Sequence, residues 1–201
     1  MRRNKVALAL AAIALTPALL ITTPASAADP VGAPTACQAP TDTFVVTTPV
    51  DEMSDDDVRV TILRIIGDPS TGSAVEAAAQ KAMDGTIEDQ RNFLTTDRWP
   101  ARAEDDEVAV FTTLHFAGVY KDRGVTKAAQ EALGDGTPTA LRTFLTTGCR
   151  LAQFDDDRVA IFRILANPTT NSAVRAAAKQ ALDAGTPEAA RYFLEHGQFE
   201  V

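Results

Sequence analysis

Few residues of this chain have the types and spacing that enzyme chemistry needs. It contains two histidines, His115 and His196, and neither has the serine, cysteine or metal-ligand pattern of a hydrolase or a metal centre around it. We interpret His115 as a core or rim histidine of a helix. We place His196 in a last helical turn, where partial positive charge is favourable. We therefore expect no catalytic residue, no metal site and no bound cofactor.

Three acidic clusters are the remaining candidates for chemistry. Carboxylate oxygens can bind calcium, and two carboxylates close together in a buried site can act as acid and base. The clusters lack the glycine and terminal glutamate of a calcium loop, and each precedes an apolar segment of helical period. We therefore expect them to cap first helices and to oppose the helix dipoles. They are Asp55–Asp57, Glu104–Glu107 and Asp155–Asp157.

An arginine recurs two residues before a Phe-Leu pair at three places, as Arg91, Arg142 and Arg191. Positive charge at this position favours the C-terminal end of a short helix, and it can also pair with the acids of an adjacent repeat. A ladder of ligand-binding arginines is the alternative. Solvated charge is the commoner explanation, so we expect a structural role.

The two cysteines, Cys37 and Cys149, form a candidate disulfide. An even number of cysteines in an exported chain suggests pairing, and such a bond needs Cα atoms within about 7 Å of each other. Two free, buried thiols are the alternative.

Residues 1–27 have the pattern of a signal peptide. A basic start is followed by an apolar stretch from Val6 to Ile21 and by the small-residue site Ala25-Ser26-Ala27. No other segment is apolar for long enough to cross a membrane. We therefore expect a secreted, extracellular protein.

The charge of the chain limits its partners. Removal of residues 1–27 takes away Arg2, Arg3 and Lys5 but no acid, so 16 basic side chains face 27 acidic ones, a net charge of −11. This charge repels phosphate backbones and anionic lipids, which argues against nucleic-acid and membrane binding. It favours solubility or a basic partner.

The chain contains three copies of one pattern, about 50 residues apart. A Gly-Thr-Pro turn followed by Phe-Leu appears at 185–194 and at 136–145, and a weaker copy appears at 85–94. Such a period indicates stacked supersecondary units. A second helix in each copy carries the same apolar stripe. The stripes are Val75, Ala78, Ala79, Ala82, Met83; Val125, Ala128, Ala129, Ala132, Leu133; and Val174, Ala177, Ala178, Ala181, Leu182.

Each copy is therefore predicted to contain three helices. The first helix of the third copy is apolar over a wide arc from Val159 to Leu165, so it should be covered on more than one side. Thr186-Pro187 starts a short third helix after Gly185, a residue suited to positive φ. In the first copy, Thr86 and Asp89 have capping-box spacing.

We predict an all-α fold, a short α-solenoid of three repeats with one continuous core. The domain boundaries are 28–54 for an N-terminal arm, 55–103 for repeat 1, 104–153 for repeat 2 and 154–201 for repeat 3. Residues 40–54 are a candidate degenerate repeat that caps the array, although Val45–Thr48 also fits extended chain. Two extra residues within 118–124 predict a surface loop that exposes Tyr120.

The Ala-x-x-Ala-Leu helix, the Gly-Thr-Pro turn and the closing Phe-Leu resemble the alanine-leucine-phenylalanine (ALF) repeat of secreted actinobacterial proteins. The resemblance covers Asp55 to Gly197 and is strongest in the third copy. It implies a repeat without an assigned activity. Larger members look like scaffolds that hold partner subunits of secreted toxin particles. No functional residue can be transferred from them.

We expect a non-catalytic extracellular module that holds an unidentified protein partner, because catalytic groups are lacking and the array ends without a polar cap. A second copy of the chain is another candidate partner. The alternatives are a structural or cell-envelope protein without a specific partner and, as the weakest, a hydrolase with paired carboxylates.

Overall fold

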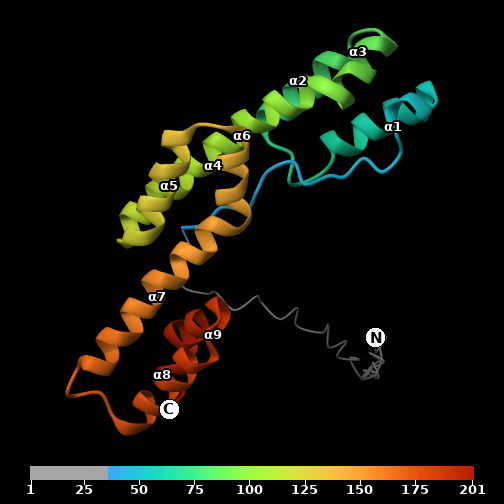
Figure 1. Cartoon of the computed structure of the whole chain (residues 1–201). Helices are drawn as coiled ribbons and strands as arrows, with labels where there is room; N and C mark the ends of the chain where they lie inside the picture. The colour runs from blue at the N-terminus through green and yellow to red at the C-terminus, as the bar shows by residue number, and fades with distance from the viewer. Residues whose placement is uncertain (1–35) are drawn as a thin grey trace, which may run out of the picture. The chain divides into compact units, whose positions relative to one another are not determined.

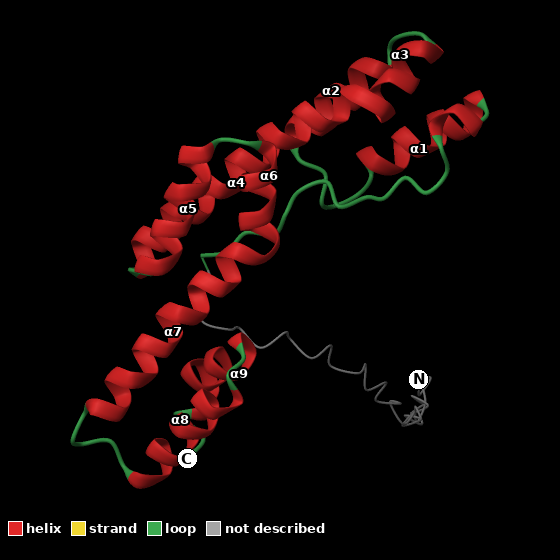
Figure 2. Ribbon diagram, in the orientation of Figure 1, coloured by secondary structure: helices red, strands yellow, loops and turns green. Residues whose placement is uncertain are grey.

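The computed structural model describes residues 36–201, and this part of the chain is helical without a β-strand (Figures 1 and 2). The predicted signal peptide and residues 28–35 of the arm lie outside the described residues. The α-helices are α1 (Asp55–Ile66), α2 (Ser73–Met83), α3 (Ile87–Asn92), α4 (Arg98–Tyr120), α5 (Arg123–Asp135), α6 (Pro138–Thr143), α7 (Cys149–Ala166), α8 (Ser172–Ala184) and α9 (Pro187–Tyr192). They form three triplets, α1–α3, α4–α6 and α7–α9, which confirms the predicted all-α repeat array.

Consecutive repeats are joined by π-helical turns instead of loops. The turn η2 (Phe93–Asp97) connects α3 to α4, and η3 (Phe144–Gly148) connects α6 to α7. A third turn of this kind, η4 (Phe193–Gly197), follows α9. Because the residues that flank η2 and η3 keep helical φ and ψ, each third helix runs directly into the next first helix. The expected boundaries at 103/104 and 153/154 therefore fall inside α4 and α7.

The turns within each repeat follow the local sequence signals. Thr86, Thr137 and Thr186 cap the third helices by accepting the amide three residues later, and Thr86 forms the predicted capping box with Asp89. Gly136 and Gly185 end α5 and α8 at φ of 68° and 65°, a region that glycine adopts without a steric penalty.

The buried apolar residues fall into three clusters, one for each repeat. The second helices contribute their predicted stripes, for example Val75, Ala79 and Ala82 in α2. The prediction of one continuous core is wrong, because buried polar side chains lie on the helices that join the repeats. These side chains are Arg98, Asp105, Asp106, Thr113, Gln153 and Asp157.

The segment 118–124 is not a surface loop. Gly118 to Tyr120 continue α4, and the chain turns only at Lys121, which has φ of 64°. The Tyr120 ring is half-buried and stacks on Phe116 with ring centroids 6.0 Å apart. The extra residues therefore lengthen a helix.

Residues 36–54, named here the N-terminal strap, lie in extended form along repeats 1 and 2. No helix forms over residues 40–49, and a single 3₁₀ turn, η1 (Val50–Glu52), precedes α1. Phe44, Val46 and Val50 pack against the core of repeat 1. The strap therefore covers this core as extended chain and not as the decayed helical repeat that the sequence suggested.

Two anchors fasten the strap at equivalent positions of α4 and α7. Arg98, the first residue of α4, forms a two-pronged ion pair with Asp42 at 2.6 and 2.8 Å, and both side chains are buried. Cys149, the first residue of α7, forms the predicted disulfide with Cys37, with Cα atoms 5.7 Å apart. Closing so long a loop stabilises a fold by about 4 kcal/mol in the chain-entropy model.

None of the helices within residues 36–201 combines the length and the hydropathy required to cross a bilayer.

Candidate functional site

The first acidic cluster lies at the start of a first helix, as predicted. Ser54 precedes α1 and accepts the amide of Asp57, and Asp55, Asp56 and Asp57 occupy the first turn. Their negative charge opposes the positive end of the helix dipole. In repeat 1 the acids therefore oppose the helix dipole as expected, but the cap is Ser54 and not an acid.

In repeats 2 and 3 the expectation that the acids cap their own first helices is wrong, because the acids lie inside α4 and α7. Asp105 accepts from the amides of Ala74 and Val75 at 2.9 and 3.0 Å, so it caps α2 of the preceding repeat. Asp156 accepts from the amides of Gly124 and Val125 at 2.8 to 3.2 Å and caps α5. Each acid therefore satisfies the helix start of the repeat before it.

The close approach of Asp105 explains a glycine. A Cβ on Gly72, the residue before α2, would lie 2.2 Å from the Asp105 Cγ atom, so no other residue fits there without a shift. The last repeat uses a different cap: Asn171 accepts the amide of Val174, so the start of α8 is satisfied within its own repeat. Among the described helices, the cross-repeat cap thus operates at the two junctions that join repeats.

The recurring arginines pair with acids of their own repeat. Arg91 contacts Asp55 at 2.9 Å, Arg142 contacts Asp106 at 2.8 Å and Arg191 contacts Asp157 at 2.7 Å. Each pair joins the third helix to the first helix of one repeat. The expectation of pairing between adjacent repeats is wrong, because the acid that faces the adjacent repeat is the one directly before, Asp105 or Asp156.

Two of these arginines also bind the N-terminal strap. Arg91 donates to the carbonyl oxygens of Val50 and Met53 at 2.6 and 2.8 Å. Arg142 donates to the carbonyl of Thr41 at 2.6 Å, and Asp106 accepts from the Thr41 hydroxyl at 2.8 Å. In repeats 1 and 2 the recurring arginine therefore binds the main chain of the N-terminal strap.

Acids gather where repeats 2 and 3 meet. Burial raises the pKa of Asp157 to about 6, while Arg191 opposes the rise and Asp122, Asp156 and Glu195 add to it. The pKa of Asp122 is also raised, first by burial and then by Asp156. Two of these carboxylates have structural partners, since Asp156 caps α5 and Asp157 pairs with Arg191. Within residues 36–201, no group of three or more His, Cys, Asp and Glu side chains has the arrangement of a metal site.

The two histidines lie on different repeats. His115 is exposed on α4 beside Phe116, with ring centroids 5.3 Å apart. His196 lies in η4, 5.4 Å from the Tyr192 ring and 3.9 Å from Glu195.

An exposed apolar surface recurs on the first helix of every repeat. Val60, Phe111 and Phe162 stand at one position, each 51 residues after the last, with 44%, 53% and 52% of the side chain exposed. A second exposed apolar residue lies one turn away in each helix: Leu63, Val108 and Val159. We name these six residues the apolar ladder. The sequence indicated that the helix carrying Val159 and Phe162 should be covered on more than one side, and within the described residues this side is uncovered.

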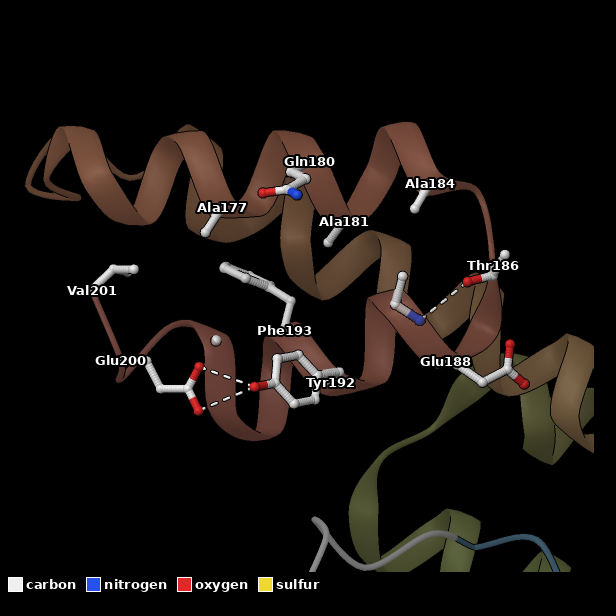
Figure 3. Close-up of a pocket in the computed structure, with 12 residues that line it drawn as sticks. Ala177, Gln180, Ala181, Ala184, Thr186, Glu188, Tyr192, Phe193, Glu200 and Val201 are labelled. Atoms are coloured by element: carbon white, nitrogen blue, oxygen red, sulfur yellow. Dashed lines mark hydrogen bonds between the residues drawn. The ribbon is translucent and has the colours of Figure 1, made fainter.

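The second helix also borders hollows. In repeat 3, Ala177 and Ala181 of α8 face Phe193 across a hollow of about 600 Å³, and the Tyr192 hydroxyl bonds to Glu200 at its edge (Figure 3). In repeat 1, the equivalent Ala78 and Ala82 line a hollow of about 440 Å³. Small side chains in the stripe leave this space beside the third helix.

Comparison with known proteins identifies the repeat. The profile of the ALF family, described as short repeats of unknown function, matches residues 59–98, 123–152 and 158–200. A search of curated proteins gave no match. The three matched segments cover more than half of the chain, and each contains the second and third helices of one triplet, so this chain belongs to the ALF repeat family.

Proposed function

We propose that this chain is a secreted, non-catalytic module that holds a protein partner through the apolar ladder. The observation that carries the proposal is the recurrence of exposed apolar residues at one position of α1, α4 and α7. Single exposed apolar side chains are ordinary on protein surfaces. Here three of the six recur at the repeat period, the other three lie one turn from them, and together they form a surface suited to binding.

The charge around the ladder favours a basic partner. Glu104 and Glu107 are exposed on α4, one turn before Val108 and Phe111. Asp56 on α1 and Asp155 on α7 are also exposed, although each pairs with an arginine three residues later, and the whole chain has a net charge of −8. An interface with an apolar centre and an acidic rim is complementary to apolar side chains bordered by Lys or Arg. The same acids would face one another if two copies met through their α4 helices.

Secretion is supported by the signal-peptide pattern of residues 1–27 and by the Cys37–Cys149 disulfide, which suits an oxidising compartment. A non-catalytic role is supported by the partners of the buried and half-buried acids on α4 and α7. Asp105, Asp106, Asp156 and Asp157 are engaged by main-chain amides or by arginines. A carboxylate pair that acts in hydrolysis needs oxygens that can reach a substrate.

The proposal is tested by affinity capture from culture supernatant with three forms of the chain. The first is the wild type. The second carries Phe111→Asp and Phe162→Asp, which place charge in the ladder. The third carries Val45→Asp and Phe199→Asp, a matched charge change at residues that are 73% and 76% exposed outside the ladder.

We expect one basic protein to be retained by the wild type and the third form and lost from the second. Retention by all three forms would place the interface elsewhere. A chain that captures nothing and stays bound to the cell envelope on fractionation would favour the structural alternative. Concentration-dependent self-association that the ladder substitutions abolish would make a second copy the partner.

A further inference from the structure

Two guanidinium groups, the buried one of Arg98 and the partly exposed one of Arg142, each contain a buried nitrogen without a hydrogen-bond acceptor. Arg98 has 1% of its side chain exposed. Its Nε and Nη2 atoms donate to Asp42, while its Nη1 atom has no acceptor among the described residues. Arg142 donates through Nη1 to the Thr41 carbonyl, and its Nη2 atom is likewise buried without an acceptor. An unsatisfied buried donor is costly, the more so when its group is charged.

Both arginines border the same hollow, between the N-terminal strap and the start of α4. It has a volume of about 580 Å³ and is also lined by Arg102, Trp99, Phe44 and Leu94. Arg102 lies over the Trp99 ring at 4.6 Å from its centroid, and Trp99 is 43% exposed. Arg98 also lies over the Trp99 and Phe44 rings, at 5.4 and 5.9 Å from their centroids, so the hollow combines aromatic rings with guanidinium groups.

The positive charge is not fully balanced. The acids that pair with these arginines are Asp42 and Asp106, two carboxylates against three guanidinium groups. Burial lowers the pKa of Arg142, whereas Asp106 and Asp42 oppose this change and the positive charge of Arg102 adds to it. An anion between the arginines would offset this repulsion, and a shift of the side chains that cover the two buried nitrogens would let it accept hydrogen bonds from them.

We propose that this hollow binds an oxyanion, a phosphate or a carboxylate, held by Arg98, Arg102 and Arg142. Guanidinium groups bind both classes through parallel N–H donors. Phe44, Leu94 and Trp99 leave room for a small apolar body attached to the anionic group. None of the residues of this site belongs to the apolar ladder, so the proposal does not depend on the proposed function.

The probes are inorganic phosphate and succinate, each compared with chloride at equal ionic strength. Binding to the folded chain raises its melting temperature, and isothermal titration measures the affinity directly. Arg102→Gln is the informative variant, because Arg102 has no ion pair among the described residues and its loss leaves the buried pairs of Arg98 and Arg142 in place. Arg163→Gln removes an equal charge from an exposed position of α7 and is the matched control.

We expect phosphate, succinate or both to bind saturably to the wild type and to Arg163→Gln. Arg102→Gln should bind at least about tenfold more weakly, the effect of one charge-assisted hydrogen bond. The preferred probe identifies the class of anion. No binding beyond chloride would overturn the proposal and would leave water as the acceptor for the buried nitrogens. Equal binding by all three forms would also overturn it.

Discussion

At the scale of single residues, consecutive acids on one helix have different tasks. Asp105 caps α2 of repeat 1, and the next residue, Asp106, pairs with Arg142 of repeat 2. Asp156 and Asp157 divide the same two tasks at the following junction. Neighbouring side chains on a helix point about 100° apart, so two adjacent acids can face two different repeats. In the second and third acidic clusters, one acid therefore links two repeats and the next acid links two helices of one repeat.

Removal of the cross-repeat cap should destabilise the chain. Asp105→Ala leaves the amides of Ala74 and Val75 without their acceptor, and we expect a loss of about 1 to 2 kcal/mol in the free energy of unfolding. Asp105→Asn keeps an acceptor and should lose less. Denaturant unfolding measures both, with Glu104→Ala as the exposed control. An Asp105→Ala protein as stable as this control would contradict the cap.

The buried ion pair between Asp42 and Arg98 offers a second prediction. Asp42 has φ of 45°, which asparagine also tolerates, so Asp42→Asn removes the charge without new backbone strain. It leaves the Arg98 charge buried and unpaired, which should cost about 3 to 5 kcal/mol. Glu131→Gln breaks the exposed pair with Lys127 and should cost less than about 0.5 kcal/mol. Equal losses in thermal or denaturant unfolding would refute the assigned role of the strap anchor.

Asp157 should make stability depend on pH. Its pKa is about 6 in the folded chain and about 3.9 in an unfolded one, so the folded state binds the proton more tightly. The extra stability is present below pH of about 4, falls as the pH rises to about 6 and is absent above that. The slope from this group cannot exceed about 1.4 kcal/mol per pH unit.

The measurement is the free energy of unfolding at several pH values for the wild type and for Asp157→Asn, which lacks the titrating group. We expect the difference between the two to change across this window, whereas Asp155→Asn, at an exposed position, should follow the wild type. A constant difference would show that Asp157 titrates alike in both states.

At the scale of helices, the sequence predicted the interior of each repeat better than the joins. Thr86, Thr137 and Gly185 act within a few residues, so their caps and turns can be read locally. The joins depend on hydrogen bonds between groups about 31 residues apart in the sequence. An acid before an apolar segment looks the same in the sequence whether it caps its own helix or a helix of the preceding repeat. A usable signal was the repeated Phe-Leu-Thr-Thr at 93–96 and 144–147, where the Thr95 and Thr146 hydroxyls bond back to helical carbonyls.

The continuous helix across a join leads to opposite predictions for two glycines. Gly148 has helical φ and ψ of −61° and −45°, and a Cβ there would meet its nearest atom at 3.5 Å, an ordinary contact. Gly148→Ala should therefore stabilise the chain by about 0.5 to 1 kcal/mol. Gly185→Ala, at φ of 65°, should destabilise it by about 1 to 2 kcal/mol. Denaturant midpoints measure both, and loss of stability in Gly148→Ala would argue against a continuous helix at this join.

At the scale of the whole described chain, the three repeats differ in their support. The strap packs on repeat 1, binds Arg142 of repeat 2 and contacts repeat 3 at the start of α7, through Cys149 and Gln153. The buried apolar cluster of repeat 3 is also the smallest of the three. Stability in repeat proteins is the sum of units and interfaces, so it should vary along this chain.

We therefore predict that repeat 3 opens before the rest. In hydrogen exchange under native conditions, the amides of α8 and α9 should exchange faster than those of α2 and α5, which are covered from both sides along the array. Equal protection in all three repeats would mean that the junctions transmit stability fully and that the chain opens as one unit.

Because Asp105 and Asp156 cap helices that precede them in the chain, the cap residue is synthesised after the helix that it caps. The amides at the start of α2 are satisfied by a residue that leaves the ribosome 31 positions later, and α5 waits in the same way for Asp156. The Cys37 thiol waits longer, for a partner 112 positions downstream. Repeats 1 and 2 are thus fully capped only after the next first helix has been synthesised. A chain that ended between two repeats would leave the first amides of its last second helix without their acceptor.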